Sequence, residues 1–235
     1  MEYDEKKIRD VEQAINQSGY TLADLINQLG RHNSKMLMMS DEYLTKFSEL
    51  LSCIEKGNLS KQDKGKKLEE LSELLFRKSV ENLFDIYKNC RTSTNEIDLL
   101  IRWTENARLA GINRAFPFMG DIFLCECKNY NGAVSVTYVG KFSSLMSVTN
   151  SVFGIMISWD GVTGRNKWTD AKGLIKKIAL RENRYIIVLD RADLKEISEK
   201  KKSVFSLAYD KYTALKNEID YNKYIEKHGA ESFMT

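Results

Sequence analysis

One apolar segment, residues 123–129, carries two charged residues, and this combination constrains the fold more than any other feature of the sequence. It reads Phe-Leu-Cys-Glu-Cys-Lys-Asn. Successive side chains of a β-strand point to opposite faces of the sheet. A strand at this position therefore has Glu126 and Lys128 on one face and Cys125 and Cys127 on the other.

A second apolar segment with an internal carboxylate precedes it. Residues 95–100 read Asn-Glu-Ile-Asp-Leu-Leu and contain Asp98. Asp98 and Glu126 on neighbouring strands can hold a hard divalent cation, because Mg²⁺ prefers one or two carboxylates with waters and phosphate oxygens. The backbone carbonyl of Cys127 is a candidate third ligand, and Lys128 is placed to orient a water or contact a phosphate. The pattern indicates metal-assisted hydrolysis of a phosphodiester, in which the metal activates water and stabilises the leaving oxygen.

The composition bounds the class of protein. With 235 residues, 43% of them hydrophobic, the chain can form one domain with an appendage or two small domains. No apolar run reaches the roughly 18 residues of a membrane span, and the N-terminus has no apolar signal-peptide core. Four cysteines suit a reducing compartment. We therefore expect a cytoplasmic protein without membrane association.

Several site classes are disfavoured. The two histidines, His32 and His228, have no other plausible ligand nearby in sequence, which argues against histidine-based zinc hydrolysis and Ser-His-Asp catalysis. Cys125 and Cys127 lack a second cysteine pair at zinc spacing. There is no glycine-rich phosphate loop. A net charge of only +3 does not indicate a protein that coats DNA.

The N-terminal part reads as helical from residue 4 to about residue 57, with apolar residues at helical spacing and no strand signal. We expect residues 1–58 to form a helical appendage for oligomerisation or partner docking. Packing onto the core is the simpler alternative. The segment 19–25 also resembles a helix-turn-helix, so DNA reading by this region is a further alternative.

From residue 60 onward the expected order of elements is α-β-β-β-α-β-α-β. Three strands with short links predict an antiparallel meander, and strands reached through helices predict parallel crossovers. The fold class is therefore α/β, with a mixed sheet covered by helices (α+β). The segment 104–119, which contains the only proline, reads as a loop. The expected elements are a helix from 60, strands at 83–89, 95–102 and 121–128, a helix at 136–149, a strand at 152–158, a helix at 168–181, a strand at 185–190 and a helix at 202–227.

The constellation resembles the PD-(D/E)XK nuclease superfamily, with Asp98 as the leading aspartate and Glu126-Cys127-Lys128 as the (D/E)XK element. Within that superfamily it looks most like the Mrr-like restriction endonucleases, which carry a Gly-x-x-apolar-Glu motif on a preceding helix. Residues 65–69, Gly-Lys-Lys-Leu-Glu, match that motif. The resemblance covers roughly residues 60–198. Ile97 stands where many members have proline, which does not by itself argue for lost activity.

The resemblance implies a restriction-endonuclease-like core, α-β-β-β-α-β, at residues 59–198, and the region 199–235 would then be a helix packed on it. It implies that Glu69 lies next to the metal site as an auxiliary ligand, with Glu70 and Glu73 as alternatives if the register differs. It also implies Mg²⁺ or Mn²⁺ as the cofactor and DNA as the substrate.

Two further cations are candidate contacts for the nucleic acid. Lys141, in the helix after the lysine strand, can reach a backbone phosphate, or can be an ordinary solvated helix residue. Arg165 ends a Gly-Val-Thr-Gly-Arg loop between Trp159 and Trp168. The two tryptophans can stack on a base, or they can close the core.

We therefore expect a Mg²⁺-dependent endodeoxyribonuclease of prokaryotic restriction or anti-phage defence, working as a homodimer because cutting both strands needs two sites. Two alternatives stay open. The chain can be a nuclease-fold effector or scaffold subunit that is active only with a protein partner bound through residues 1–58, since fold does not fix function. It can also be a nucleic-acid-binding module with a degenerate site, in which Glu126 and Lys128 form only a structural ion pair.

Overall fold

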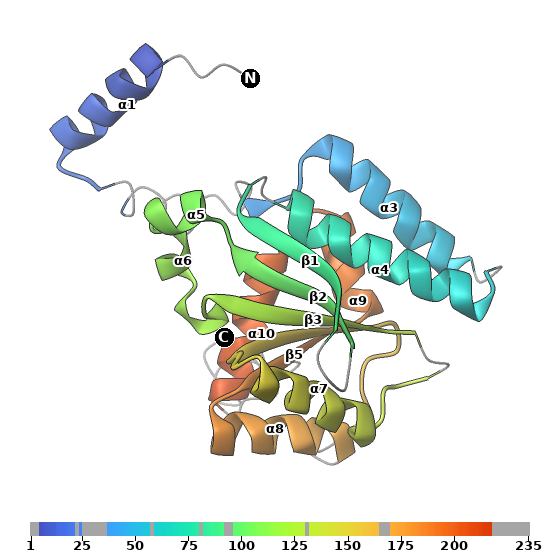
Figure 1. Cartoon of the computed structure of the whole chain (residues 1–235). Helices are drawn as coiled ribbons and strands as arrows, with labels where there is room; N and C mark the ends of the chain where they lie inside the picture. Colours follow the sequence, from blue (N-terminus) through green and yellow to red (C-terminus); the bar gives the residue numbers. More distant parts are fainter. Residues whose placement is uncertain are drawn as a thin grey trace, which may run out of the picture.

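The computed structural model describes residues 5–21, 24, 37–56, 59–79, 82–91, 96–129, 132–164 and 170–217. Its centre is a five-stranded mixed sheet with helices on both faces (Figure 1). The expected α/β class is thereby confirmed, as is the order of the strands.

The sheet follows the chain order β1-β2-β3-β4-β5. β1, β2 and β3 pair antiparallel, whereas β3, β4 and β5 pair parallel. The meander and the two parallel crossovers predicted from the sequence are both present. The strands are β1 (Phe84–Arg91), β2 (Glu96–Trp103), β3 (Ile122–Lys128), β4 (Phe153–Ser158) and β5 (Tyr185–Leu189).

Helices cover the sheet on both sides (Figure 1). α4 (Lys61–Lys78) packs on β1 and β3, and α3 (Asp41–Glu55) packs on α4 and on α9 (Arg191–Ser198). α7 (Val136–Val148) and α8 (Asp170–Glu182) pack on each other and lie at the opposite face. α10 (Val204–Lys216) contacts β5 and α8.

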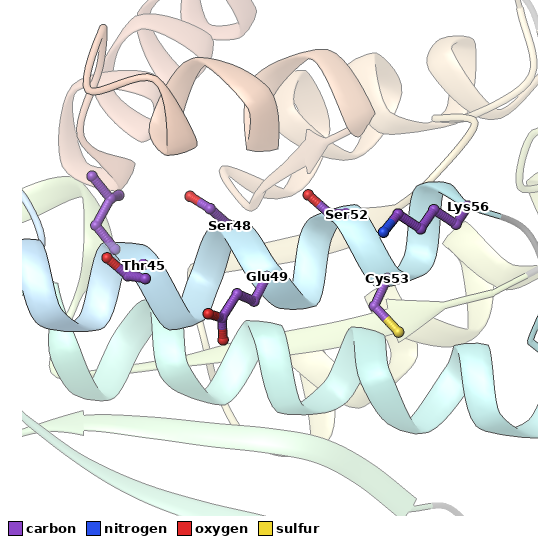
Figure 2. A pocket seen from close by; sticks show the side chains of 7 residues that line it. Thr45, Ser48, Glu49, Ser52, Cys53 and Lys56 are labelled. Carbon is purple, nitrogen blue, oxygen red and sulfur yellow. The ribbon is translucent and has the colours of Figure 1, made fainter.

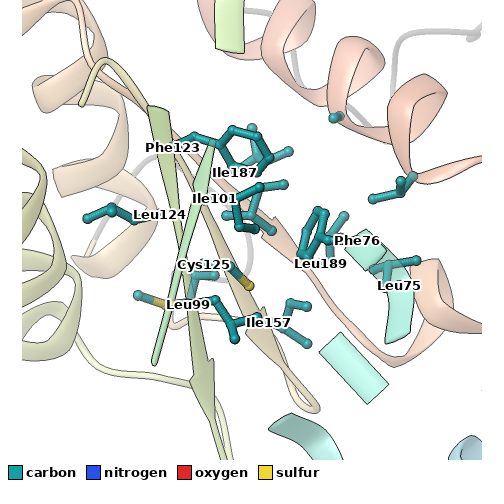
Figure 3. Packing of buried hydrophobic residues seen from close by; sticks show 14 of the residues in the cluster. Leu75, Phe76, Leu99, Ile101, Phe123, Leu124, Cys125, Ile157, Ile187 and Leu189 are labelled. Atoms are coloured by element: carbon teal, nitrogen blue, oxygen red, sulfur yellow. The ribbon is translucent and has the colours of Figure 1, made fainter. Parts of the chain in front are cut away.

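One part of the hydrophobic core lies between the sheet and α4. The side chains of Leu99, Cys125 and Ile157 point from three strands toward the face where Leu75 and Phe76 of α4 lie (Figure 3). These residues are buried, and each such side chain contributes about 1.5–3 kcal/mol to the stability of the fold.

α7 approaches the other face of the sheet closely at Gly154. A Cβ atom built on Gly154 would lie 2.8 Å from the sulfur of Met146 and 2.8 Å from Cε1 of Phe142. A larger residue at this position of β4 would force the Met146 and Phe142 side chains of α7 to shift, so glycine here serves helix packing and not a turn. Interiors are close-packed, so no neighbouring space receives the displaced atoms.

The segment 104–119 is not the loop expected from the sequence. It contains the short helices α5 (Glu105–Leu109) and α6 (Ile112–Ala115) and the 3₁₀ turn η2 (Pro117–Met119). Thr104 caps α5 by accepting the backbone N–H of Ala107, and Pro117 begins η2. Elements of three to five residues are too short to produce a helical periodicity in the sequence.

Two other boundaries differ from expectation. α9 was not predicted, although Asp190 begins it with a capping box that also involves Asp193. The last helix, expected over 202–227, spans Val204–Lys216, and residues 218–227 lie outside the described residues.

The N-terminal region contains α1 (Glu5–Ser18), which lies apart from the sheet in Figure 1, and α3. Within α3, Leu44, Phe47, Leu51 and Ile54 are buried in the main core. Part of the region expected as an appendage, residues 1–58, thus packs with the sheet and its helices. None of the described helices is both long and apolar enough to cross a lipid bilayer.

Candidate active site

The strand register brings the predicted carboxylates together. Leu99 of β2 pairs with Cys125 of β3, so the next positions toward the site, Asp98 and Glu126, are neighbours on the opposite face. A hydrogen bond fixes this junction: the backbone N–H of Cys127 donates to Oδ2 of Asp98 at 2.7 Å. The sheet itself therefore positions the side chain of Asp98 against β3.

Glu126 and Lys128 form an ion pair on the same face of β3. The ammonium of Lys128 donates to Oε1 of Glu126. The Glu126 side chain is only 8% exposed and the Lys128 side chain 21% exposed. An exposed ion pair would be a common surface feature of little energetic weight. This pair is mostly removed from water, which a purely solvated strand face does not explain.

The second carboxylate oxygen of Glu126 has no partner. Among the described residues, Oε2 of Glu126 is one of three buried side-chain atoms without a hydrogen bond. A buried polar atom left unpaired destabilises the fold by about 1–3 kcal/mol, and more if charged. Such an atom is explained most simply by a ligand that completes its coordination.

The pKa shifts of Asp98 and Glu126 also indicate a site for a cation. Burial raises the pKa of Asp98, against the lowering effects of the Cys127 N–H and the Lys128 ammonium. Burial and, next, repulsion from Asp98 raise the pKa of Glu126, and Lys128 opposes both. The two carboxylates therefore resist being ionised together, and a divalent cation between them would relieve that repulsion.

These donors fit a hard cation such as Mg²⁺. Two carboxylates converge, one with an unpaired oxygen, and Mg²⁺ is usually held by one or two carboxylates. No group of three or more His, Cys, Asp or Glu side chains able to hold a metal occurs in the described part of the chain. The Cys127 carbonyl stays a predicted third ligand.

Glu69 lies beside this pair but not within it. It lines a hollow of about 190 Å³ together with Asp98 and Lys88. Burial and then repulsion from Asp98 raise the pKa of its carboxyl, which indicates that the two groups are close. The alternatives are engaged elsewhere, since Glu70 pairs with Lys67, and Glu73 pairs with Arg77 and Lys88. Glu70 lines the same hollow as Glu69, and the choice of Glu69 as the auxiliary carboxylate stays a prediction.

The start of α4 is attached to the end of the lysine strand. Asn129, which follows Lys128, donates from Nδ2 to the backbone carbonyl of Lys61 at 2.8 Å. A Cβ built on Gly65 would lie 3.9 Å from the same Nδ2, an ordinary contact. Asn129 thus helps to set the position of the helix that carries Glu69.

Sequence reasoning missed this bond and two others. It did not identify Asn129 as a tie to α4, the Cys127 N–H as the donor that holds Asp98, or the contact at 3.1 Å between Sγ of Cys127 and Oγ of Ser72. A polar Asn directly after the motif was the only signal available, because backbone donors and helix–strand contacts leave no mark in the sequence.

The two outlying cations predicted to meet nucleic acid are not joined to the site by these contacts. Lys141 is exposed on α7, with its Nζ 5.6 Å from the ring centroid of Tyr138 in the same helix. Arg165 and Trp168 lie outside the described residues.

A second hollow, of about 520 Å³, follows α3 (Figure 2). Leu44, Thr45, Ser48, Glu49, Ser52, Cys53 and Lys56 line it, all from α3 and its C-terminal cap. Glu49 is the one carboxylate among them. The hollow therefore offers no carboxylate pair for metal chemistry.

The chain matches a known protein family. A family model described as a restriction endonuclease matches residues 61–198, more than half of the chain. No curated protein matches. A solved structure titled "DNA modification-dependent restriction endonuclease AspBHI" aligns with 80% of this chain at 13% identity and a TM-score of 0.37. The chain spans 43% of the length of that structure.

Proposed function

Because this chain belongs to the Mrr-like restriction endonuclease family of PD-(D/E)XK nucleases, we propose that its Asp98–Glu126–Lys128 site hydrolyses phosphodiester bonds of DNA with the help of Mg²⁺ or Mn²⁺. The observation that carries the proposal is the unpaired, buried Oε2 of Glu126 beside a second carboxylate and an ammonium. A structural ion pair alone would leave no reason for that oxygen to stay unsatisfied.

In this proposal, each residue of the site has a separate role in the reaction. Asp98 and Glu126 would hold the metal, with the Cys127 carbonyl as a third ligand and Glu69 as an auxiliary carboxylate. When bound, the metal would supply a water of lowered pKa and neutralise charge on the phosphate. The Cys127 N–H keeps Asp98 in place. The Lys128 ammonium would turn from Glu126 toward the attacking water or the scissile phosphate and stabilise the charge that develops there.

The biological setting follows from the family and is part of the proposal. A restriction-type nuclease cuts foreign DNA, and it would meet that DNA in the cytoplasm. Cutting both strands in one encounter needs two sites, so we propose a homodimer as the working form. Partner docking through residues 1–58 stays a proposal as well.

The test is cleavage of supercoiled and linear plasmid DNA with Mg²⁺, with Mn²⁺ and with EDTA. We expect metal-dependent cutting by the full chain and none by Lys128→Ala. Lys216→Ala is the matched control, because Lys216 is an exposed lysine on α10 whose ammonium lies over the ring of Tyr212. Equal cutting by the wild type and Lys128→Ala would contradict the proposal.

A further inference from the structure

Trp159 directly follows β4, at the same end of the sheet as Lys128. Lys128 of β3 pairs in register with Ser158 of β4, and Trp159 is the next residue. Trp159 is 8% exposed, so it closes the core rather than presenting its ring to solvent. Of the two readings of this tryptophan, base stacking and core closure, the structure supports the second.

Two cations lie over the Trp159 ring. Nζ of Lys64 is 5.2 Å from the ring centroid, and Cζ of Arg191 is 5.7 Å from it. Both distances are within the range of a favourable cation–π contact, which contributes about 0.5–1 kcal/mol at an exposed site. The ring thereby holds two positive charges from different helices, α4 and α9, at the end of the sheet where β3 and β4 terminate.

Backbone contacts hold both cations in place. Lys64 is one turn of α4 after Lys61, whose carbonyl accepts the Asn129 side chain from the end of the lysine strand. The backbone N–H of Arg191 donates to the carbonyl of Trp159 at 3.3 Å. Asn129 thus ties the helix of Lys64 to the end of β3, and the Arg191 N–H ties Arg191 to the end of β4.

The carboxylates nearby are already engaged. Asp160 accepts the backbone N–H of Gly132, and Asp190 accepts the N–H groups at the start of α9. Glu55 bonds Arg191 through Nε at 3.1 Å. A guanidinium has four more N–H donors on its two Nη nitrogens, so this bond leaves Arg191 able to meet another anion.

We propose that Lys64 and Arg191, held over Trp159, bind phosphates of duplex DNA at the end of the sheet that carries Lys128. This inference rests on the proposed function, since it takes DNA as the substrate, and it names the groups that position it. Phosphate is the partner that suits the pair, because both groups are cationic and the ring between them is covered. The pair would let a chain with a net charge of only +3 bind DNA without a large basic surface.

The test is binding of a fluorescently labelled DNA duplex to the full chain in EDTA, measured by anisotropy over a series of salt concentrations. Each phosphate contact removed lowers the slope of log affinity against log salt by about 0.9. We expect Lys64→Gln and Arg191→Gln each to lower the slope by about that amount and to weaken binding roughly three- to tenfold. Lys64→Arg, which keeps the charge, should retain most of the affinity.

Lys216→Ala is the matched control. Its Nζ lies 5.5 Å from the ring centroid of Tyr212, so it removes the same kind of cation–π contact. Tyr212 packs against Tyr185, the first residue of β5, at the end of the parallel strands opposite to Lys128. The slope of log affinity against log salt for Lys216→Ala should equal that of the wild type.

Three results would overturn the inference: no duplex binding by the wild type, unchanged slopes for both Gln variants, or an equal loss in Lys216→Ala. Melting temperatures of all variants verify that they are folded. Binding in EDTA does not depend on cutting, so failure of the inference is distinct from failure of the proposed function, which the plasmid assay with Lys128→Ala reports.

Discussion

Asp98 and Cys127 are joined across two strands by a hydrogen bond of 2.7 Å from the Cys127 N–H to Oδ2 of the carboxylate. The bond holds the leading acidic residue against the strand that carries Glu126 and Lys128. It makes the position of the Asp98 carboxylate a property of the sheet, because one end of the bond is backbone. The predictions below follow from this junction and from the packing around it.

Replacing Asp98 by Asn should abolish cleavage while leaving the fold intact. Asn can accept the same N–H from Cys127 but carries no charge for the metal. Loss of a supporting residue around a metal commonly lowers affinity or activity 10–100-fold, so loss of the ligand itself should exceed about a hundredfold. Cleavage kinetics at saturating Mg²⁺, together with a thermal melt, check this. Near-normal cutting by the variant would remove Asp98 from the site.

Glu126→Gln should stabilise the metal-free protein at neutral pH. The pKa of Glu126 is raised above its ordinary 4.5 in the folded state by burial and by Asp98. Between the unfolded and the folded pKa of Glu126, the folded state binds more protons than the unfolded state. The contribution of Glu126 to the free energy of unfolding is therefore greatest at low pH and is lost as pH rises through the folded pKa. The gain should be about 1 kcal/mol, or roughly 2–4 °C in melting temperature.

The measurement is the difference in melting temperature between Glu126→Gln and the wild type, in EDTA, as a function of pH. The difference should grow as pH rises above about 4.5, the ordinary pKa of the group. Added Mg²⁺ should raise the melting temperature of the wild type and have less effect on the variant. If the melting temperatures of the wild type and the variant differ by the same amount at all pH values, the pKa of Glu126 is not raised by its surroundings.

Glu69→Gln should lower activity less than changes at Asp98. Glu69 is exposed at the hollow that Asp98 also lines, so it can support the metal without being its main ligand. We expect a loss of about tenfold, in the range typical of outer groups around a metal. Glu42→Gln is the control, because Glu42 pairs with Lys46 on the surface of α3, away from this hollow. The prediction fails if both variants cut equally well.

Gly154→Ala should destabilise the fold by about 1–3 kcal/mol, the usual effect of overpacking a core. The new Cβ would meet Met146 and Phe142 of α7 at 2.8 Å. Gly140→Ala is the control within α7, since its Cβ would lie 3.8 Å from Leu174 and alanine favours a helix by up to about 1 kcal/mol over glycine. Urea unfolding of both variants should show opposite signs, and a neutral Gly154→Ala would disprove the close approach of α7.

The sequence by itself determined the strands, their order and the residues of the motif. Alternating apolar and charged positions around Asp98, Glu126 and Lys128 follow from the two-residue period of a strand, which is a local property. The meander and the parallel crossovers followed from the lengths of the links, which limit how strands can pair. These features depend on residues close together in the chain, so the sequence alone predicts them.

Only the tertiary structure decided which groups meet across elements. It placed Oε2 of Glu126 in a buried position without a partner, brought Asn129 to Lys61, and set Lys64 and Arg191 over Trp159. These residues are far apart in sequence, and their contacts depend on register and helix packing. The physical reason is that burial and cross-strand distance arise from many weak contacts acting together, which no local pattern encodes.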